Sequence, residues 1–550
     1  MTQELITLQF GPMACFVGSH FWNIQEASFR YADSTGATAA ASNPGAEADH
    51  DALFRAGEDS RGRTTYTPRV VLCDRWSSLP TPTVDDVDAV DLDGAAAGEA
   101  AALSSRGLPV EVHPVQRNGS ERHQFQRRAF AEIGTDDQGD VGEEMQYAES
   151  SFRAWNDCLG TRLHPRSLLR LSPLVAEAVG LQQQLEEDVE SRLRLFAEEC
   201  DRLQGFQLLS DAPDPTFGGS LTSWALAYLA EEFPKKARLF LPCLPHPDWL
   251  SVEASCRKSP PAYRLISWLT LVRSESLAGL IAPLSSPTSP IPEPWLSASP
   301  SASASSAPMS QYAATAAVAS WLDTVTLPTR LRFGNQPDLG DVQRLLCQSG
   351  RRFCGSAARL YRPDGQPLDA AALSAPPPIG PFAAGPEHSS VACLSVGRCL
   401  PSSPRQQPAE SAAIVERWLS DVRAPGAGHL ARHIHLVSPP LTAKPPFPTG
   451  LLLPPDPALE PEVSGSNPAA TASRLRRNAY QKIGCWAMLD NSSATADSLD
   501  SLTDAVEFSA RSSGSVRNSI SLINLELDEL KEAVAAARDI ADQYRPDKAL

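Results

Sequence analysis

The sequence lacks any apolar run that approaches the ~20 residues a membrane-spanning helix needs. Its N-terminal residues also lack the basic and apolar regions of a signal peptide and the Arg-rich pattern of a matrix presequence. We therefore expect no transmembrane segment and no cleaved targeting sequence. Any membrane association is expected to be peripheral or to run through a partner.

Positive charge is also scarce, with 48 Lys and Arg against 65 Asp and Glu, a formal net charge of -17. Binding to phosphate backbones needs concentrated Lys and Arg, so this balance argues against nucleic acid as a direct partner. The 11 cysteines include no Cys-x-x-Cys pair, which favours a reducing compartment. No His pair completes a site with Cys347 and Cys354, and we predict no metal centre.

The apolar runs that are present predict an α/β fold that starts near the N-terminus. Leu5, Ile6 and Leu8 indicate a buried strand that Gly11 ends, and residues 16–29 look helical. Residues 70–73 are all apolar and are followed by Asp74, which is typical of a central parallel strand. Strand, glycine turn and helix in this order favour a domain built on a parallel sheet.

A second strand–helix–strand unit follows further along the chain. Helical spacing ends at Gly205, which we interpret as a helix stop, and residues 206–209 then predict a strand. Residues 210–220 are predicted as a loop, and a helix follows that ends before Pro234. The next strand is predicted at residues 238–244.

Composition divides the chain into two domains. We predict an N-terminal nucleotide-binding-type domain at residues 1–282, with flexible insertions at 33–65 and 77–107. Residues 283–310 are almost entirely Pro, Ser and Ala and are predicted as a linker. A smaller second domain with Pro-rich loops follows at residues 311–550. It ends in a helix at residues 522–545, whose apolar stripe we expect to pack on its own domain rather than in a coiled coil with a partner.

Three segments resemble tubulin in the same order along the chain. They are residues 4–11 with Gly18, Phe21 and Trp22; residues 68–74; and residues 203–208 with 231–234. Other stretches resemble the Misato family, fungal members especially: residues 16–25, 49–55, 163–167 and 321–328. The resemblance covers about half of the chain before residue 330 and little beyond residue 360. It implies a tubulin-like fold in which loops at the carboxyl ends of parallel strands hold GTP.

The residues that match this GTP-type site are few, and we expect the site to be degenerate. The resemblance assigns to it Gly11, Asp74, Gly218, Gly219 and Ser220. For Asp74 two roles stay open, contact with a metal ion and capping of the strand end. For Gly218 and Gly219 the alternative to phosphate binding is a tight turn before a helix. We predict no resident cofactor, with GTP as the ligand to test.

Several positions depart from the tubulin pattern. Pro12 removes an amide from the first loop, which we place at residues 11–18, and the next acidic residue of the pattern falls at Trp76. Asp214 would face a polyphosphate, and at an effective dielectric constant of ~20 two unit charges ~4 Å apart repel by about 4 kcal/mol. In tubulin-type hydrolysis, a loop of the next subunit in a filament supplies an acidic residue that orients water. The resemblance places this loop at residues 310–316, which hold no carboxylate.

These departures predict a protein that is not an enzyme. The resemblance implies a role in partitioning mitochondria, in inheritance of mitochondrial DNA, and in organelle distribution and morphology. Protein partners at the mitochondrial surface or cytoskeleton, and a location on the outer mitochondrial face and in the cytoplasm, follow from the same resemblance. The alternative is a GTP-binding, polymerising GTPase, and a client or cofactor of tubulin-folding chaperones is a further class.

Overall fold

The computed structural model describes the chain in separate stretches. They are residues 3–29, 48–58, 64–75, 125, 151–171, 179–245, 260–285, 310–332, 336–361, 376–399, 413–419, 431–448, 481–512 and 525–545, with gaps at 377, 383–387, 418, 438–439 and 445. The predicted insertion at residues 77–107 and nearly all of the predicted linker at 283–310 lie outside these stretches.

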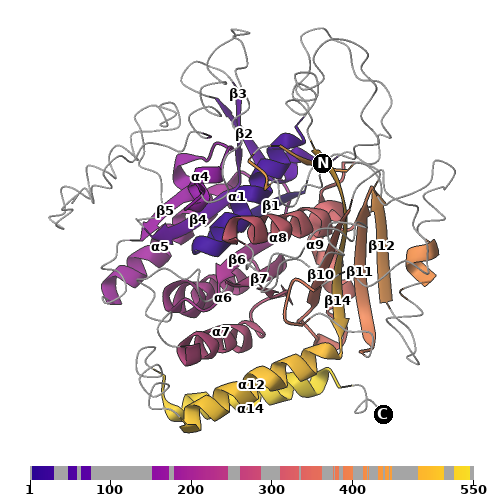
Figure 1. Cartoon of the computed structure of the whole chain (residues 1–550). Helices are drawn as coiled ribbons and strands as arrows, with labels where there is room; N and C mark the ends of the chain where they lie inside the picture. Colours follow the sequence, from indigo (N-terminus) through magenta and orange to yellow (C-terminus); the bar gives the residue numbers. More distant parts are fainter. Residues whose placement is uncertain are drawn as a thin grey trace, which may run out of the picture.

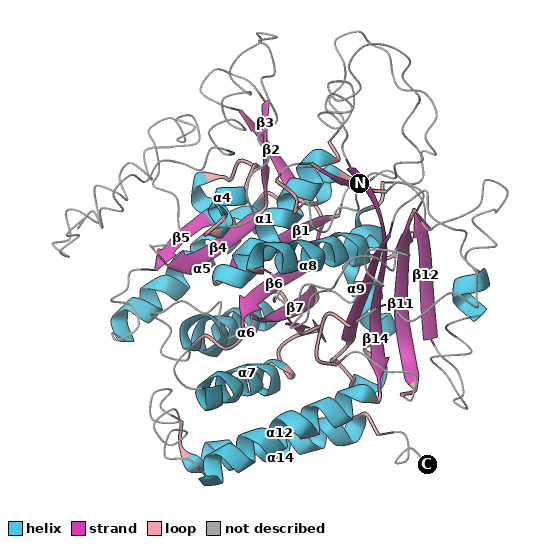
Figure 2. Ribbon diagram, in the orientation of Figure 1, coloured by secondary structure: helices cyan, strands magenta, loops and turns pink. Residues whose placement is uncertain are grey.

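A parallel sheet forms the core of the N-terminal half (Figure 1, Figure 2). Its strands, in spatial order, are β5 (Leu168–Leu171), β4 (Val70–Arg75), β1 (Glu4–Phe10), β6 (Leu203–Asp211), β7 (Ala237–Leu244) and β8 (Leu280–Ile281), and β9 (Leu284–Ser285) pairs with β7. Every pairing in this sheet is parallel. The predicted α/β class is confirmed.

Helices cover both faces of this sheet. Alternate side chains of β1 point to opposite faces, so Leu5 enters one core with α1 (Pro12–Ala27) and α8 (Gln311–Thr326), while Ile6 and Phe10 enter the other. The second core is closed by four elements listed in chain order: α5 (Val179–Glu198), α6 (Thr222–Glu232), α7 (Pro260–Ser274) and the C-terminal helix pair. The parallel sheet therefore lies between two helical layers.

A second, mixed sheet lies in the C-terminal half. Its order is β10 (Gly355–Tyr361), β14 (Gln481–Ser492), β11 (Ser390–Arg398) and β12 (Ala431–Val437), and β13 (Leu441–Ala443) pairs with β14. The pair β11–β12 is parallel and the other pairs are antiparallel. The helix α9 (Leu339–Leu346) precedes this sheet and contacts β11 and β12 as well as β6 and β7.

Helix α8 connects the two sheets. Trp321 donates its indole N–H to the carbonyl of Met488 in β14 at 3.2 Å, while the same helix packs along α1. Asp323 of α8 is buried among Arg330, Arg398 of β11 and Gln25 of α1, and all three donate hydrogen bonds to its carboxylate. Hydrophobic side chains of α1, α8 and both sheets form one continuous core.

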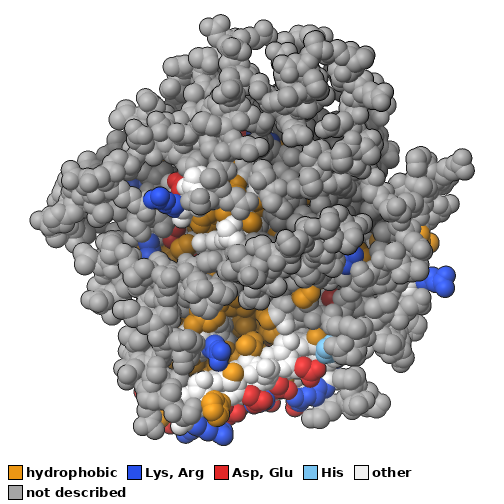
Figure 3. All heavy atoms as spheres, viewed as in Figure 1, with side chains coloured by type: hydrophobic (Ala, Val, Ile, Leu, Met, Phe, Trp, Pro, Cys, Tyr) orange, Lys and Arg blue, Asp and Glu red, His pale blue; other side chains and the backbone are white. Residues whose placement is uncertain are grey.

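The C-terminal helices α12 (Ala494–Ser512) and α14 (Leu527–Gln543) lie side by side against α7 (Figure 1). Leu530, Ala537 and Tyr544 are buried in the second core, so the last helix packs on its own chain, against α12 of the predicted second domain and also against α7 of the predicted N-terminal domain. The helix is shorter than predicted, and Leu527 at its first position is exposed. Acidic and basic side chains gather along the outer side of these helices (Figure 3).

The prediction of a loop throughout residues 33–65 is wrong for its described part. Residues 48–58 hold the short helix η2 (His50–Ala52) and strand β2 (Phe54–Glu58), which pairs with β3 (Thr64–Pro68). Phe54 is buried against Trp22 and Phe29, with ring centroids 5.7 and 4.8 Å away. The packing of Phe54 on Trp22 of α1 holds the hairpin to the core. The polar composition of the surrounding residues gave no sign of this contact.

Gly205 does not stop a helix, because it lies inside strand β6, which starts at Leu203. A Cβ atom at this position would lie 2.4 Å from the carbonyl oxygen of Ala237 on β7. The glycine therefore permits close pairing of the two strands. The predicted strands at residues 70–73 and 238–244 and the helix before Pro234 are confirmed by β4, β7 and α6. Among the described helices, none is both long and apolar enough to cross a membrane.

Candidate functional site

The first candidate element is the start of α1, and it is a helix rather than the predicted loop. Helix α1 begins at Pro12, directly after Gly11, so the prediction of a loop over residues 11–18 is wrong. Proline suits the first helical position, where its missing N–H would have no partner within the helix. Pro12 therefore fits the helix, although it leaves this N-terminus with one amide fewer.

The next two amides of α1 already hold a carboxylate. Met13 donates its backbone N–H to Oδ2 of Asp211 at 3.0 Å, and Ala14 donates to Oδ1 at 2.9 Å. Asp211 is the last residue of β6 and is only 4% exposed. A carboxylate at a helix N-terminus is favoured by the free amides and by the helix dipole. The chain thus places a carboxyl group of its own where the resemblance places a phosphate.

Gly11 makes room for this carboxylate. Its φ of 99° is a backbone conformation that favours glycine, and a Cβ atom would lie 2.7 Å from Cγ of Asp211. Gly11, which the resemblance assigns to the GTP-type site, lets the side chain of Asp211 approach the start of α1 in the structure.

The second candidate element is the turn after β6, which forms a π-helix, η8 (Pro215–Leu221), in place of most of the predicted loop at residues 210–220. Asp214 caps it: Oδ1 accepts the amides of Thr216 and Phe217 at 2.9 and 3.2 Å. The carbonyl of Asp214 accepts the amides of Gly218 and Gly219 at 2.8 and 3.0 Å. These four amides, together with those of Met13 and Ala14, are called the cradle below.

Asp214 does not face an open phosphate site. Its Oδ2 accepts a hydrogen bond from Nη2 of Arg75 at 2.5 Å, and the guanidinium of Arg75 also lies over the ring of Phe217, 4.8 Å from its centroid. The negative charge that was expected to repel a polyphosphate is therefore neutralised by a cation from the end of β4. Sequence reasoning missed this role of Arg75, because the pair is separated by 139 positions.

The predicted site residue Asp74 is fully buried beside the cradle. Its Oδ2 accepts the indole N–H of Trp155 in α4 (Trp155–Cys158) at 2.9 Å, and its Oδ1 accepts the backbone N–H of Arg75 at 2.7 Å. Of the two roles considered for Asp74, the contacts are those of a strand-end cap. In the described part of the chain, no group of three or more His, Cys, Asp or Glu side chains is placed to hold a metal ion. Trp76 lies outside the described residues.

The glycines of the second element differ sharply in their surroundings. A Cβ atom on Gly218 would lie 2.3 Å from the backbone oxygen of Ala212, whereas one on Gly219 would meet nothing closer than 4.0 Å. Ser220 donates its hydroxyl to the carbonyl of Thr216 at 3.0 Å, so it stabilises the turn from within. The tight-turn interpretation fits Gly218.

This contrast gives a matched pair of substitutions. Gly218→Ala should lower the free energy of unfolding by about 1–3 kcal/mol, because the new methyl group overlaps backbone that cannot rotate away. Gly219→Ala, one position on, should leave stability within about 0.5 kcal/mol of the parent chain or raise it slightly. Urea unfolding of both variants measures the difference, and equal stabilities would mean that the turn is placed wrongly.

The electrostatics of the cradle oppose a further anion. Burial raises the pKa of Asp211 to about 8, the amides of Met13 and Ala14 pull it down, and the carboxylates of Asp214 and Asp74 add to the rise. Between pH 4, near the unfolded pKa, and about pH 8, the folded chain therefore holds a proton on Asp211 that the unfolded chain has lost. Because of this difference, the contribution of Asp211 to stability declines as the pH rises through that range. A polyphosphate bound there would lie near the carboxyl groups of Asp211, Asp214 and Asp74 and the guanidinium of Arg75.

The placement of the neighbour-activating loop at residues 310–316 is wrong. These residues form the cap and first turns of α8, and most are buried because the helix is covered on all sides. The segment that leaves α8 toward the second sheet leads instead to α9. Its N-terminal turn carries Asp338 and Asp341, each of which accepts the backbone N–H of the other. Carboxylates are therefore present in the connecting region.

An aromatic stack lies next to these elements and was not predicted. Phe152 stacks on Tyr312 at the start of α8, with ring centroids 4.5 Å apart and planes 13° apart, and His20 of α1 lies 4.9 Å from the same Tyr ring. Three positions after Phe152, Trp155 reaches Asp74. The segment from Phe152 to Trp155 therefore links two places: Phe152 contacts Tyr312 of α8, and Trp155 contacts Asp74 beside the cradle.

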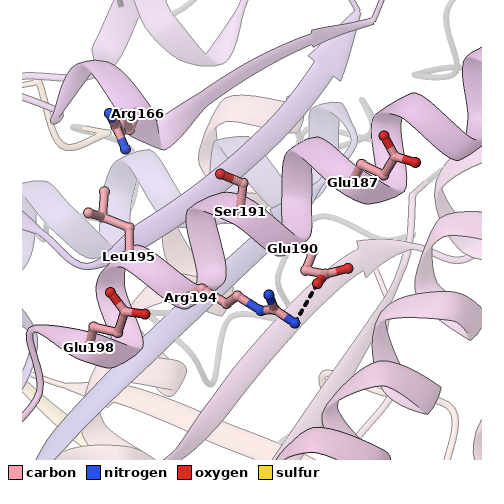
Figure 4. Close-up of a pocket in the computed structure, with 7 residues that line it drawn as sticks. All are labelled: Arg166, Glu187, Glu190, Ser191, Arg194, Leu195 and Glu198. Carbon is pink, nitrogen blue, oxygen red and sulfur yellow. Dashed lines mark ion pairs between the residues drawn. The ribbon is translucent and has the colours of Figure 1, made fainter. Parts of the chain in front are cut away.

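A separate groove runs along the outer face of α5 (Figure 4). It encloses about 380 Å³ and is lined by Arg166, Glu187, Glu190, Ser191, Arg194, Leu195 and Glu198. Arg194, one of the two arginines that line the groove, pairs with Glu190 at 2.7 Å, so its charge is already neutralised. The groove contains none of the predicted site residues.

Comparison with known proteins agrees with the tubulin-like fold. Residues 3–128 match the Misato Segment II tubulin-like domain, and residues 145–331 match a tubulin domain. The chain is 32% identical to Protein misato of Drosophila melanogaster over 42% of its own length and 43% of that protein, so the match spans less than half of this relative. It is 27% identical to Protein misato homolog 1 of Bos taurus over 81% of its length and 83% of that protein. A fungal relative, Protein dml1 of Aspergillus clavatus, is 28% identical over 60% of each chain. The chain belongs to the Misato family of tubulin-like proteins.

Proposed function

We propose that this protein is a non-catalytic tubulin-like protein that acts as an interaction scaffold. One observation carries the proposal: the backbone amides of the cradle are already bound to Asp211 and Asp214. Phosphates bind tubulin-like sites through such amides, so GTP would have to displace two internal carboxyl groups before it could bind.

The proposed biological role rests on the resemblance to the family. Misato proteins are the relatives of this chain, and the family resemblance implies a part in partitioning mitochondria, in mitochondrial DNA inheritance and in mitochondrial distribution and morphology. A scaffold for this role would act at the outer mitochondrial surface and in the cytoplasm, through protein partners there. The proposal involves neither nucleic acid nor a resident cofactor.

The second candidate function is a GTP-binding, polymerising GTPase. It is favoured by Asp338 and Asp341, which bring carboxylates to the connection between the two sheets. Tubulin-type hydrolysis needs a group that orients water in the next subunit of a filament. Both carboxylates are engaged with the start of α9, and Asp341 also pairs with Arg344. They would have to leave these contacts to act on water.

A nucleotide assay separates the two functions. The purified protein should show no saturable GTP binding and no turnover above the protein-free rate, with or without magnesium, because the cradle offers no unbound amides. Concentration-dependent turnover that Asp341→Ala removes, with the fold intact, would establish the polymerising enzyme instead. Protease treatment of intact mitochondria tests the location: the bound fraction should be digested, whereas protection equal to that of a matrix marker contradicts an outer-surface scaffold.

A further inference from the structure

Two arginines lie on either side of strand β8, at the amino end of its neighbour β7. Arg238 is the second residue of β7, and its carbonyl accepts the backbone N–H of Gly279 at 3.0 Å. Arg352 lies on the other side, where its carbonyl accepts the backbone N–H of Ile281 at 2.8 Å. The cradle lies at the carboxyl end of the sheet, where β6 ends, so this arginine pair is a separate feature.

Backbone carbonyls hold the two guanidinium groups in place. Arg238 donates Nε to the carbonyl of Leu277 at 2.9 Å. Arg352 donates Nη1 to the carbonyls of Glu275 and Ala278, the latter at 3.3 Å. These three carbonyls belong to the turn that follows α7, and cations suit the carbonyls at the end of a helix. The bonds therefore orient both side chains without neutralising their charge.

The positive charge of the pair is only partly balanced. The carboxylate of Glu275 lies 3.8 Å from Nε of Arg352, too far for a hydrogen bond, and the described residues supply no second ion pair to either arginine. Burial lowers the pKa of Arg238, and the charge of Arg352 lowers it further. Two guanidinium groups against one carboxylate leave positive charge on a chain whose formal net charge is -17.

Each guanidinium also keeps a donor. Nη1 of Arg238 donates to the carbonyl of Lys236 at 3.4 Å, but among the residues that the structure describes, Nη2 of neither arginine has a hydrogen-bond partner. Both side chains are only partly buried, and that of Arg352 is 33% exposed. Capping of α7 accounts for the bonded nitrogens and leaves these two donors unexplained. Neighbouring guanidinium donors match the oxygens of carboxylates.

We propose that Arg238 and Arg352 form a docking site for an acidic segment of a partner protein, whose carboxylates contact both guanidinium groups. Such a segment would satisfy the two donors and balance the remaining charge. The acidic remainder of the chain repels it, so binding is confined to the place where positive charge is concentrated. The inference goes beyond the proposed function, because this site lies away from the cradle and holds whether or not GTP binds.

The test measures binding of a fluorescein-labelled polyglutamate peptide to the full chain by fluorescence anisotropy. Binding should be saturable at low salt and weaken as salt rises, because exposed charges are screened. Arg238→Gln and Arg352→Gln should each raise the Kd about tenfold, as expected for loss of a charge-assisted hydrogen bond. Arg194→Gln is the matched control, because it removes the same charge from an arginine that already pairs with Glu190 at 2.7 Å. Its Kd should stay within about twofold of the parent value.

The outcomes separate this site from general attraction and from a small-anion site. A parent chain without saturable binding overturns the proposal outright, and so does an equal loss of affinity in Arg194→Gln. Inorganic phosphate that displaces the peptide at equal concentration would identify a small-anion site and contradict docking of a protein segment. Where a glutamine variant does not fold, Arg238→Lys and Arg352→Lys take its place. They keep the charge but lose the paired donors, so binding as tight as that of the parent chain contradicts the site.

Discussion

Replacing Asp323 with alanine should lower the free energy of unfolding by about 3–5 kcal/mol, because it leaves two buried guanidinium groups without their shared carboxylate. Arg330 and Asp323 are both about 2% exposed, and Nη2 of Arg330 lies 2.8 Å from Oδ1. Arg398 pairs with the other oxygen. Chemical denaturation at neutral pH measures the loss.

The matched control is Asp497→Ala. Its carboxylate also pairs with a basic side chain, His388 at 3.2 Å, but the side chain is 75% exposed. Loss of an exposed pair should cost no more than about 1 kcal/mol. Equal losses for the two variants would show that the network around Asp323 is not a buried one.

The same network predicts a dependence on pH. Burial alone would raise the pKa of Asp323, but Arg398 and Arg330 lower it overall, helped by the hydrogen bonds from Arg330 and Gln25. A lowered pKa contributes stability above the unfolded value near 4 and loses it as pH falls toward the folded value. The parent chain should therefore lose stability on acidification below about pH 4 by more than Asp323→Ala does.

Trp22→Ala should cost about 3–5 kcal/mol of unfolding free energy, because the indole is 1% exposed and its removal leaves a large cavity between α1 and the β2–β3 hairpin. Phe21 and Phe54 pack edge-on against its ring at 4.9 and 5.7 Å. Trp224→Ala is the control. It removes the same side chain from α6, where Trp224 is half-buried and stacks on Tyr228.

Urea unfolding followed by circular dichroism compares the two tryptophan variants. Trp224→Ala should lose clearly less than Trp22→Ala, since part of its indole already contacts water. A Trp22 variant as stable as the parent chain would contradict the placement of α1 against the sheet and hairpin.

The elements that sequence reasoning located have local signals. Apolar runs at residues 5–8 and 70–73 predict β1 and β4, because strands buried on both faces need apolar side chains on both. The helix before Pro234 has a clear stop. The start of α8 has only a serine cap, Ser310: after Tyr312 the residues are mostly alanine and buried, and no periodicity separates them from a loop.

The filled cradle has partners that are distant along the chain. Asp211 and Ala14 are 197 positions apart, and Arg75 and Asp214 are 139 apart. A carboxylate that follows a strand looks the same in sequence whether it caps its own turn, binds a metal or occupies a helix N-terminus. The glycines at positions 11 and 218 were found by resemblance, but only the geometry shows that the first admits Asp211 and the second admits the backbone of Ala212.

The single core that runs through α1, α8 and both sheets has a consequence for how the gene tolerates damage. A chain cut before α8 would keep the parallel sheet but expose the apolar face of α1 that this helix covers. Such a fragment would be removed by quality control instead of acting as half a protein. Truncating alleles should then behave as complete losses, and partial function should come from single substitutions at the surface.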